Sequence, residues 1–444
     1  MDDTGFGRVD DAGFGRLLGE LLERSHKSAP GELPDLVGRI GSAMGLTDAT
    51  VFLADVQQSH LVPLPGAAAS AVGGDGRSNG RSDGRRSGDG GGDGAGAALA
   101  VEGTLAGWAY RTESMRLSPG PELVLWLPLV DGVERIGVLR VTAPVLDAAT
   151  VERCRALASL VALVVTAKAA FSDVILQAVR TRRMSLQAEL AWAFMPPRTL
   201  GTRDVTCSAV LEPAYEIGGD AFDHSLTDDS LRLAVVDAMG HDVASGLCSA
   251  LALSCCRATR RSGGDLADIT AAIDSALDQW IPDRLLTGVF ADLDVARGEL
   301  TWVNCGHPPP LLIRHHRVVP GALSRTARLP LGLGPDYQHP PSTIHRIQLE
   351  PGDRILIHTD GVTEARSRLG ELFGEPRLID TVVRATAAGE AAPEALRRLI
   401  RAILEHQNDR LTDDATILLA EWHPATERTD SRPAPAPPSG DPTP

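Results

Sequence analysis

Apolar residues recur at helical or strand spacing over most of the first 170 residues. The stretch LPDLVGRIGSAMG has helical periodicity, and ATVFLADVQQSHLVPLP is typical of strands. In LVLWLPLVDGVERIGVLRVTAP an apolar run and an alternating run flank Asp131-Gly132, which predicts a hairpin. We expect a short helix in TLAGWAYRTESMRL and a long helix in DAATVERCRALASLVALVVTAKAAF, with Asp147 as its N-cap. Together these elements predict an N-terminal α+β domain.

The segment from Phe171 to Leu200 has a helical pattern of its own, which Pro196-Pro197 ends. Its apolar positions are Val174, Leu176, Val179, Met184, Leu186, Leu190 and Phe194. We expect one helix that leaves the first domain and ends at the second. A packed linker helix and a dimeric coiled coil that acts as a signalling lever both satisfy this pattern.

Strand-like and helical runs alternate again from about Asp204 to Trp422. Strands are expected in DVTCSAVLEP, LRLAVVDAMG, GVFADLDVARGELTWVNCGH, PPPLLIR and DRILIHTDGV. Helices are expected in ASGLCSALALSCCRATRR, LADITAAIDSALDQWI and PEALRRLIRAILEHQ. Antiparallel strands interrupted by long helices predict a sandwich of sheets flanked by helices.

Three segments have too few apolar residues to pack: the first few residues, the Gly-rich stretch 66–97, and the Pro-rich stretch 424–444. We expect all three to be disordered, the second as an insertion in a loop. The chain then divides into an N-terminal segment with the first helix (1–34), a first domain (35–170), a linker helix (171–200), a second domain (201–423) and a tail (424–444).

Composition narrows the possible partners and location. The formal net charge of −15 argues against a general nucleic-acid binder, although not against a local basic patch. The longest apolar run, ALASLVALVVTAKAA, is shorter than the ~20 residues that cross a bilayer, and MDDTGFGRVDD has no secretory signal pattern. The six cysteines form no CxxC pair and are expected to be reduced. We therefore expect a cytoplasmic protein with neither a nucleic-acid nor a membrane partner.

Aspartates stand beside apolar runs at several points in the second domain. Asp220 lies in EIGGDAFDH, Asp237 ends LRLAVVDAMGH, Asp360 ends DRILIHTDGV, and Asp413 and Asp414 precede a final strand in LTDDATILLAEW. Gly-Gly-Asp alone is good turn chemistry. A carboxylate at the end of a buried strand is costly unless it is neutralised, and the recurrence favours ligands for Mg²⁺ or Mn²⁺. On this interpretation the glycines let the backbone pass close to the ion, and a two-metal site suits phosphoryl hydrolysis.

Six blocks in this half resemble, in order, the SpoIIE/RsbU-type PPM (PP2C-like) serine phosphatases over about 190–422. They are EPAYEIGGDAFDH, LAVVDAMGHDVASGLCSALA, TGVFADLDVARGELTWVNCGHPPPLLIR, LPLGLGP, LEPGDRILIHTDGVTEAR and LTDDATILLAEW. The resemblance implies an α-β-β-α sandwich with a binuclear Mn²⁺ or Mg²⁺ centre. It also implies direct attack of metal-activated water on a phosphoserine or phosphothreonine protein, with no phosphoenzyme.

The resemblance also carries over a ligand set, residue by residue. It makes Asp220 and Asp237 metal ligands and catalytic residues, with Asp237 as the bridge and the Ala238 carbonyl as a further ligand. Asp360 and Asp413 bind from the other side, and Asp414 serves either as a ligand or through hydrogen bonds. The implied substrate is an anti-sigma factor antagonist of the STAS class, which places the chain in a partner-switching pathway.

One position departs from the family pattern, and several others have an open role. Asp242 stands where the family most often has Gly, so it either adds a ligand or faces solvent. His307 either donates a proton or shapes a turn, and Asp223 is expected either in a loop or as a residue behind the ligands. His241 also lies in a family-type motif, and Glu364 and Arg366 are expected to order the loop after TDG.

The N-terminal domain resembles a GAF domain over about 35–170, on LAGWAYRTESMRL, LWLPLVDGVERIGVLRV and the helix that follows. The resemblance implies an α/β sensor of small molecules or a dimerisation scaffold without a ligand. We therefore expect regulation by this domain within a homodimer formed through it and the linker helix.

Other functions compete with this interpretation. GGDAF is similar to the GGDEF signature of diguanylate cyclases, but Ala221 replaces the Glu and the other five blocks have no place in that fold. A phosphoprotein-binding regulator with a vestigial metal site would lack metal-dependent turnover. A phosphatase of small phosphoesters is argued against only weakly by the absence of a P-loop.

Overall fold

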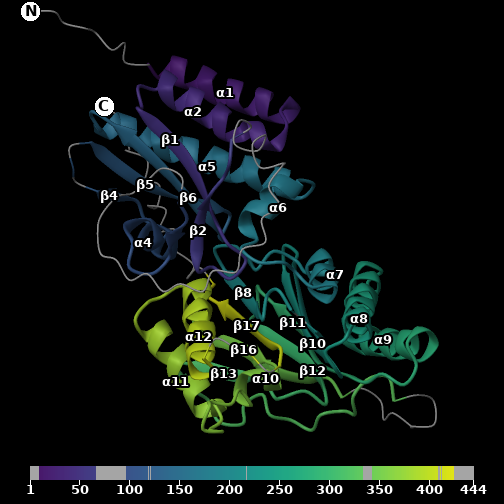
Figure 1. Cartoon of the computed structure of the whole chain (residues 1–444). Coiled ribbons are helices and arrows are strands. Elements are labelled where there is room, and N and C mark those ends of the chain that lie inside the picture. The colour runs from purple at the N-terminus through teal and green to yellow at the C-terminus, as the bar shows by residue number, and fades with distance from the viewer. Residues whose placement is uncertain are drawn as a thin grey trace, which may run out of the picture.

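The computed structural model describes residues 10–66, 97–118, 120, 122–216, 218–333, 343–408, 411 and 413–424. The predicted disorder of the first residues, of 66–97 and of 424–444 therefore falls almost wholly outside the described residues. Figure 1 shows two folded parts joined by short helices.

The N-terminal part is built on a six-stranded antiparallel sheet with the strand order β3-β2-β1-β6-β5-β4. Its strands are β1 (Asp48–Ala54), β2 (His60–Pro63), β3 (Leu99–Ala100), β4 (Arg116–Ser118), β5 (Leu123–Asp131) and β6 (Glu134–Ala143). Its helices are α1 (Asp11–Lys27), α2 (Leu33–Ala43), α4 (Leu105–Thr112) and α5 (Ala148–Ala169), with a short 3₁₀ turn at Pro30–Glu32. The predicted α+β arrangement is confirmed.

Local sequence signals fix the ends of these elements. The Asp147 carboxylate accepts a hydrogen bond from the backbone N–H of Thr150 (2.8 Å), which confirms it as the N-cap of α5. Gly132 has a positive φ of 61° in the turn between β5 and β6, so the predicted hairpin is also confirmed.

The two faces of this sheet are packed differently. Aliphatic side chains of α1, α2 and α5 cover one face. The other face, under α4, is filled by aromatic side chains, where Phe52 and Trp126 meet edge to face at 5.8 Å and Tyr110 is buried beside them. Side chains therefore close the space between the sheet and α4.

The expected continuous helix over 171–200 is wrong. The structure has two short helices, α6 (Asp173–Val179) and α7 (Leu186–Phe194), and α5 and α6 meet at a bend of 108°. Ser172 and Ser185 cap the new helices by accepting hydrogen bonds from Ile175 and Ala188. Between the helices, the N–H groups of Thr181 and Ser185 donate to Tyr215 instead of to a preceding turn. Helical spacing was preserved across the break, so periodicity alone did not reveal it.

No single helix of the described ranges is long and apolar enough to cross a membrane; the bent pair α5 and α6 passes that test only when the two are taken together. The face of α5 that makes the pair apolar is buried against the sheet of its own domain.

The C-terminal part is a sandwich of two antiparallel sheets, as predicted. One sheet has the order β15-β12-β11-β10-β9 and the other the order β14-β13-β16-β17-β8-β7. The first contains β9 (Asp220–Leu226), β10 (Ser230–Ala238), β11 (Leu286–Asp294), β12 (Glu299–Cys305) and β15 (His345–Gln348). The second contains β7 (Thr199–Gly201), β8 (Val205–Glu212), β13 (Leu311–Arg314), β14 (Arg317–Val318), β16 (Arg354–His358) and β17 (Ala415–Trp422).

Helices cover the outer faces of both sheets (Figure 1), so the order of layers is α-β-β-α. They are α8 (Val243–Arg261) and α9 (Leu266–Trp280) on the first sheet, and α11 (Gly374–Ala387) and α12 (Ala392–His406) on the second, with the short α10 (Asp360–Thr363) between β16 and α11. Of the elements in this part, the strands β7, β9, β14 and β15 and the helices α10 and α11 were not expected from the sequence.

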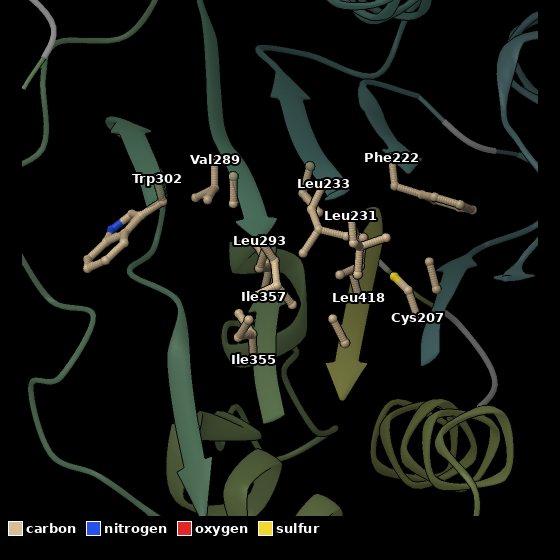
Figure 2. Close-up of a cluster of buried hydrophobic side chains, with 14 of the residues drawn as sticks. Cys207, Phe222, Leu231, Leu233, Val289, Leu293, Trp302, Ile355, Ile357 and Leu418 are labelled. Carbon is tan, nitrogen blue, oxygen red and sulfur yellow. The ribbon is translucent and has the colours of Figure 1, made fainter. Parts of the chain in front are cut away.

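The strands of the sandwich are apolar runs in the sequence because both of their faces are buried. On β10, Leu231, Leu233 and Val235 face the other sheet, as Figure 2 shows for the two leucines, whereas Ala234 and Val236 face α8 and α9. A strand buried on both faces loses the polar alternation of a surface strand. Both sheets are therefore fixed in position, which determines where their ends lie.

A charged network joins the two folded parts. Glu394 of α12 is buried and lies 3.1 Å from Arg135 of β6 and 2.8 Å from Arg397. Arg397 and Arg401 also pair with Glu102 of the N-terminal part. Because Glu394 is surrounded by arginines and shielded from water, its charge is fully engaged in holding α12 against β6.

We predict that Glu394→Ala destabilises this contact, because it leaves the buried Arg135 and Arg397 without a carboxylate. Removal of one partner of a buried pair costs about 3–5 kcal/mol. The matched control, Glu405→Ala on the same helix, removes an ion pair with a 68% exposed carboxylate and is expected to cost under about 1 kcal/mol. Urea unfolding and limited proteolysis of the full chain measure both, and equal losses would contradict the network's role.

Candidate metal-binding active site

Two of the predicted carboxylates are neighbours in one sheet. Asp220 is the first residue of β9 and Asp237 lies one residue before the end of β10, and the antiparallel register pairs them directly. Asp220 is buried and Asp237 is half-buried. The strand pairing thus places both carboxylates at the same end of the sheet.

The second sheet brings the other carboxylates to this end. Asp360 begins α10 directly after β16, and Asp413 and Asp414 precede β17. The Thr359 hydroxyl donates to Asp220 Oδ2 (2.8 Å) and accepts from the backbone N–H of Thr416 (2.9 Å). Thr359 therefore ties the sheets together at the site. Thr359 was not predicted from the sequence, although it stands directly before Asp360 at the end of an apolar strand.

Asp414 serves as an anchor for the glycine turn. Its buried Oδ2 accepts hydrogen bonds from the backbone N–H groups of Gly218 (2.7 Å) and Gly219 (2.8 Å), and a longer one from that of Asp220 (3.4 Å). Asp413, in contrast, is exposed, and its Oδ1 accepts from the N–H of Asp414. Of the two roles left open for Asp414, the structure therefore displays the hydrogen-bonding one.

Glycines beside the aspartates are required where two loop backbones meet. A Cβ on Gly219 would lie 2.1 Å from the Ala238 carbonyl oxygen and 2.9 Å from that of Gly240. A Cβ on Gly361 would lie 1.9 Å from the Asp414 carbonyl oxygen. These glycines allow one loop backbone to pack against another, and the expectation that they let the backbone pass close to an ion stays a prediction.

The electrostatics show that the carboxylates face one another. Burial, reinforced by Asp360, Asp413 and Asp414, raises the pKa of Asp237 to about 7. Burial and the neighbouring Asp237 and Asp414 raise the pKa of Asp220 well above its usual range. Like charges held together in a partly buried place disfavour ionisation, and a cation between them relieves that cost.

The donor set fits a hard divalent cation, since it consists of carboxylate oxygens and the Ala238 carbonyl without Cys or His. Within the ranges that the structure describes, no three His, Cys, Asp or Glu side chains are gathered tightly enough to enclose one ion. The structure thus brings Asp220, Asp237, Ala238, Asp360, Asp413 and Asp414 to one end of the sandwich. Their assignment as ligands stays a prediction.

Asp242 is occupied by two local contacts. Its carboxylate caps α8 by accepting from the N–H of Ser245 (2.8 Å) and forms an ion pair with Arg284 (2.9 Å). These contacts, led by the hydrogen bond from Ser245, lower the pKa of Asp242. Arg284 also donates to the Met239 carbonyl, so Asp242 helps to hold the loop that follows Asp237.

His307 is a structural residue of a turn. Burial lowers the pKa of its imidazole to about 3, so the ring is neutral near pH 7. Nδ1 is hydrogen-bonded to the hydroxyl of Thr287, and the Asn304 side chain bonds both the N–H and the carbonyl of His307. A ring that stays neutral is a poor general acid, so the turn role is favoured over proton donation.

Asp223 does not lie in a loop, one of the two places expected for it. It lies within β9, buried between Arg257 and Arg260 of α8, with both ion pairs at 2.7 Å. Arg257 also donates to the carbonyl of Phe194 at the end of α7. Asp223 therefore fixes α8, and through it the end of α7, to the strand that begins with Asp220.

The raised pKa of Asp237 makes the stability of the cation-free protein depend on pH. The folded carboxyl keeps its proton up to about pH 7, whereas an unfolded Asp loses it near pH ~3.9. Between these values the unfolded state binds fewer protons, so stability falls as the pH rises. We expect urea midpoints in EDTA to fall from pH 5 to pH 8, and to fall less in Asp237→Asn. An equal pH dependence of the urea midpoints in both proteins would show that folding does not raise the pKa of Asp237.

Comparison with known proteins gives one family match. Residues 227–423 match the model of the family described as Stage II sporulation protein E (SpoIIE). The chain is 23% identical over 250 residues to the phosphoserine phosphatase RsbU of Bacillus subtilis, covering 55% of this chain and 72% of RsbU. It is 26% identical over 260 residues to protein IcfG of a Synechocystis species, covering 52% of this chain but only 39% of IcfG.

Among solved structures, the SiaA-PP2C domain of Pseudomonas aeruginosa is similar at 21% identity and a TM-score of 0.45, covering 53% of this chain and 94% of that domain. The family model spans Asp237, Asp360, Asp413 and Asp414 but not Asp220. Residues 227–423 thus resemble a SpoIIE-type phosphatase domain.

Proposed function

We propose that the protein is a metal-dependent protein serine/threonine phosphatase. The observation that carries this proposal is the set of mutually repelling aspartates at one end of the sandwich, within a domain homologous to the phosphoserine phosphatase RsbU. Holding these carboxylates together costs electrostatic free energy. Such an arrangement suits a site in which divalent cations balance the charge of the carboxylates and of a phosphate.

The residues of the site have two roles: some would bind the metal ions, and others position those ligands. Asp220, Asp237, Asp360, Asp413 and the Ala238 carbonyl would hold a pair of Mn²⁺ or Mg²⁺ ions. Bound ions of this kind lower the pKa of water and balance the charge of phosphate oxygens. Asp414 keeps the turn before Asp220 in place, and Thr359 orients the Asp220 carboxylate through Oδ2. These two residues position the ligands rather than act on the phosphate.

Direct hydrolysis by water is supported by the poor nucleophiles nearby. Burial raises the pKa of the Cys248 and Cys305 thiols to about 12, so both stay protonated at neutral pH. His307 is buried with both sides of its turn bonded to Asn304. A covalent phosphoenzyme therefore has no suitable carrier among these groups, which favours attack by water.

We predict hydrolysis of p-nitrophenyl phosphate and of a phosphoserine peptide that requires Mn²⁺ or Mg²⁺ and stops in EDTA. Asp237→Asn should reduce kcat/KM at least about 100-fold, because one cation ligand loses its charge. The matched control is Asp228→Asn, an exposed residue at the opposite end of the β9–β10 pair, which should leave turnover unchanged. Binding of a phosphoprotein without turnover under any metal would favour the non-catalytic regulator instead.

The proposed substrate is a phosphorylated anti-sigma factor antagonist of the STAS class, in a partner-switching pathway. RsbU is named as a phosphoserine phosphatase, which supports a substrate that carries phosphoserine. Exposed apolar side chains lie close to the site, namely Met239, Val243 and Leu247, the last two on α8. Apolar exposure beside a charged centre suits the docking of a folded protein.

We predict that a phosphorylated STAS-type antagonist is hydrolysed at least about 100-fold faster, in kcat/KM, than a peptide with the same phosphoserine sequence. Contacts outside the peptide supply this difference. Met239→Ser should reduce kcat/KM for the antagonist and leave the rate on the peptide unchanged. Equal rates on antagonist, peptide and nucleotide would contradict the protein substrate and support the small-phosphoester alternative.

We further propose that the N-terminal domain is a GAF-type sensor that regulates turnover in a cytoplasmic homodimer. The charged network on α12 supports regulation, because this helix leads to the segment that carries Asp413 and Asp414. A change in the ion pairs of Arg135 or Glu102 is thus transmitted to the site through α12.

A further inference from the structure

A cavity of about 630 Å³ lies where the two folded parts meet. Its walls come from the ends of β1, β6 and α5 in the N-terminal part, from α6, and from the segment that ends in Arg198 at the start of the C-terminal sandwich. Figure 1 shows α6 and α7 in this bridging position. Small-molecule sites have volumes of about 300–1,000 Å³, so this cavity is of a suitable size.

The walls are mainly apolar, with a polar margin. Ile136, Val165, Val179, Met184 and Met195 supply aliphatic surface. The margin contains acidic groups as well as basic ones, but most of them are already engaged. Asp55 accepts bonds from the N–H groups of Ser59 and His60, and Arg180 pairs with Glu189.

Arg198 differs from these groups. Its guanidinium stacks on the Trp192 ring at 4.9 Å and donates to the Val56 carbonyl, but it forms no ion pair with a carboxylate of the described residues. Two buried carboxylates, Glu134 and Glu212, lie near enough to interact with its charge, but burial raises the pKa of both, which weakens them as counter-ions. A cation on the wall of an apolar cavity is suited to the charged end of an amphipathic anion.

We propose that this cavity is a binding site for a small amphipathic anion, with its apolar body among the methionine and aliphatic side chains and its anionic group at Arg198. Phe52 and Trp126 fill the space under α4, whereas Tyr110 of that helix is also part of the cavity wall, so the two spaces adjoin at Tyr110. Its existence does not rest on the phosphatase activity proposed above.

The cavity wall is bonded to the strand that begins with Asp220. Trp192 Nε1 donates to the Ala214 carbonyl (2.8 Å), and His224 Nε2 donates to the Pro197 carbonyl (2.7 Å). Ala214 and His224 lie on either side of Asp220 in the sequence. Occupation of the cavity therefore restrains the segment that positions Asp220.

Binding is tested on the full chain with the fluorescent probe 1-anilinonaphthalene-8-sulfonate, which has an apolar body and one sulfonate. We expect one probe per chain, displaced by decanoate. Ala169→Trp fills the cavity and should weaken probe binding at least 10-fold. Ala167→Trp, the same change at an exposed position of α5 outside the lining, is the matched control and should bind as the wild type. Circular dichroism and thermal unfolding confirm that both variants fold.

Two further measurements complete the test. Arg198→Gln should weaken decanoate at least 5-fold and leave 1-decanol unchanged, since only the acid carries a charge. Hydrogen exchange of residues 212–226 should slow when decanoate is bound. Absence of probe binding to the wild type, or unchanged binding to Ala169→Trp, overturns the site. Equal loss of decanoate and decanol in Arg198→Gln overturns the anion preference.

Discussion

Repulsion between the aspartates at one end of the sandwich is the constraint on which this structure depends. Asp220 and Asp237 are paired across two strands, and Asp360 and Asp413 add negative charge from the other sheet. The chain keeps them together because each is tied to rigid structure: Asp220 by the Thr359 hydroxyl, and the turn before it by Asp414. A cation bound here would relieve this repulsion, so part of its binding free energy would come from strain that the fold imposes on the carboxylates.

The two-sheet core is what holds the repelling carboxylates together. Side chains such as Leu231, Leu293 and Trp302 lock the sheets face to face, so their ends cannot drift apart to relieve the charge. Close backbone contacts at Gly219 and Gly361 leave no room for a side chain between the loops. Rigid packing and concentrated negative charge thus lie within a few residues of one another on the same strands.

The two folded parts are coupled by contacts of different kinds. A buried ionic network holds α12, which leads to Asp413 and Asp414, against β6. The segment through α7 is tied to the strand of Asp220 by neutral hydrogen bonds from Trp192 and His224. The N-terminal part therefore reaches both sides of the site, and the junction cavity lies beside the second of these routes.

The sequence alone predicted the layers of both parts and pointed to the aspartates that the structure brings together, because apolar periodicity, caps such as Asp147 and aspartates at strand ends are local signals. It did not reveal the break between α6 and α7, since capping serines and a distant tyrosine decide it while the helical spacing continues. Nor did it separate the roles of Asp413 and Asp414 or find Thr359. Those roles are decided by hydrogen bonds between segments more than 130 residues apart, which only the tertiary structure brings together.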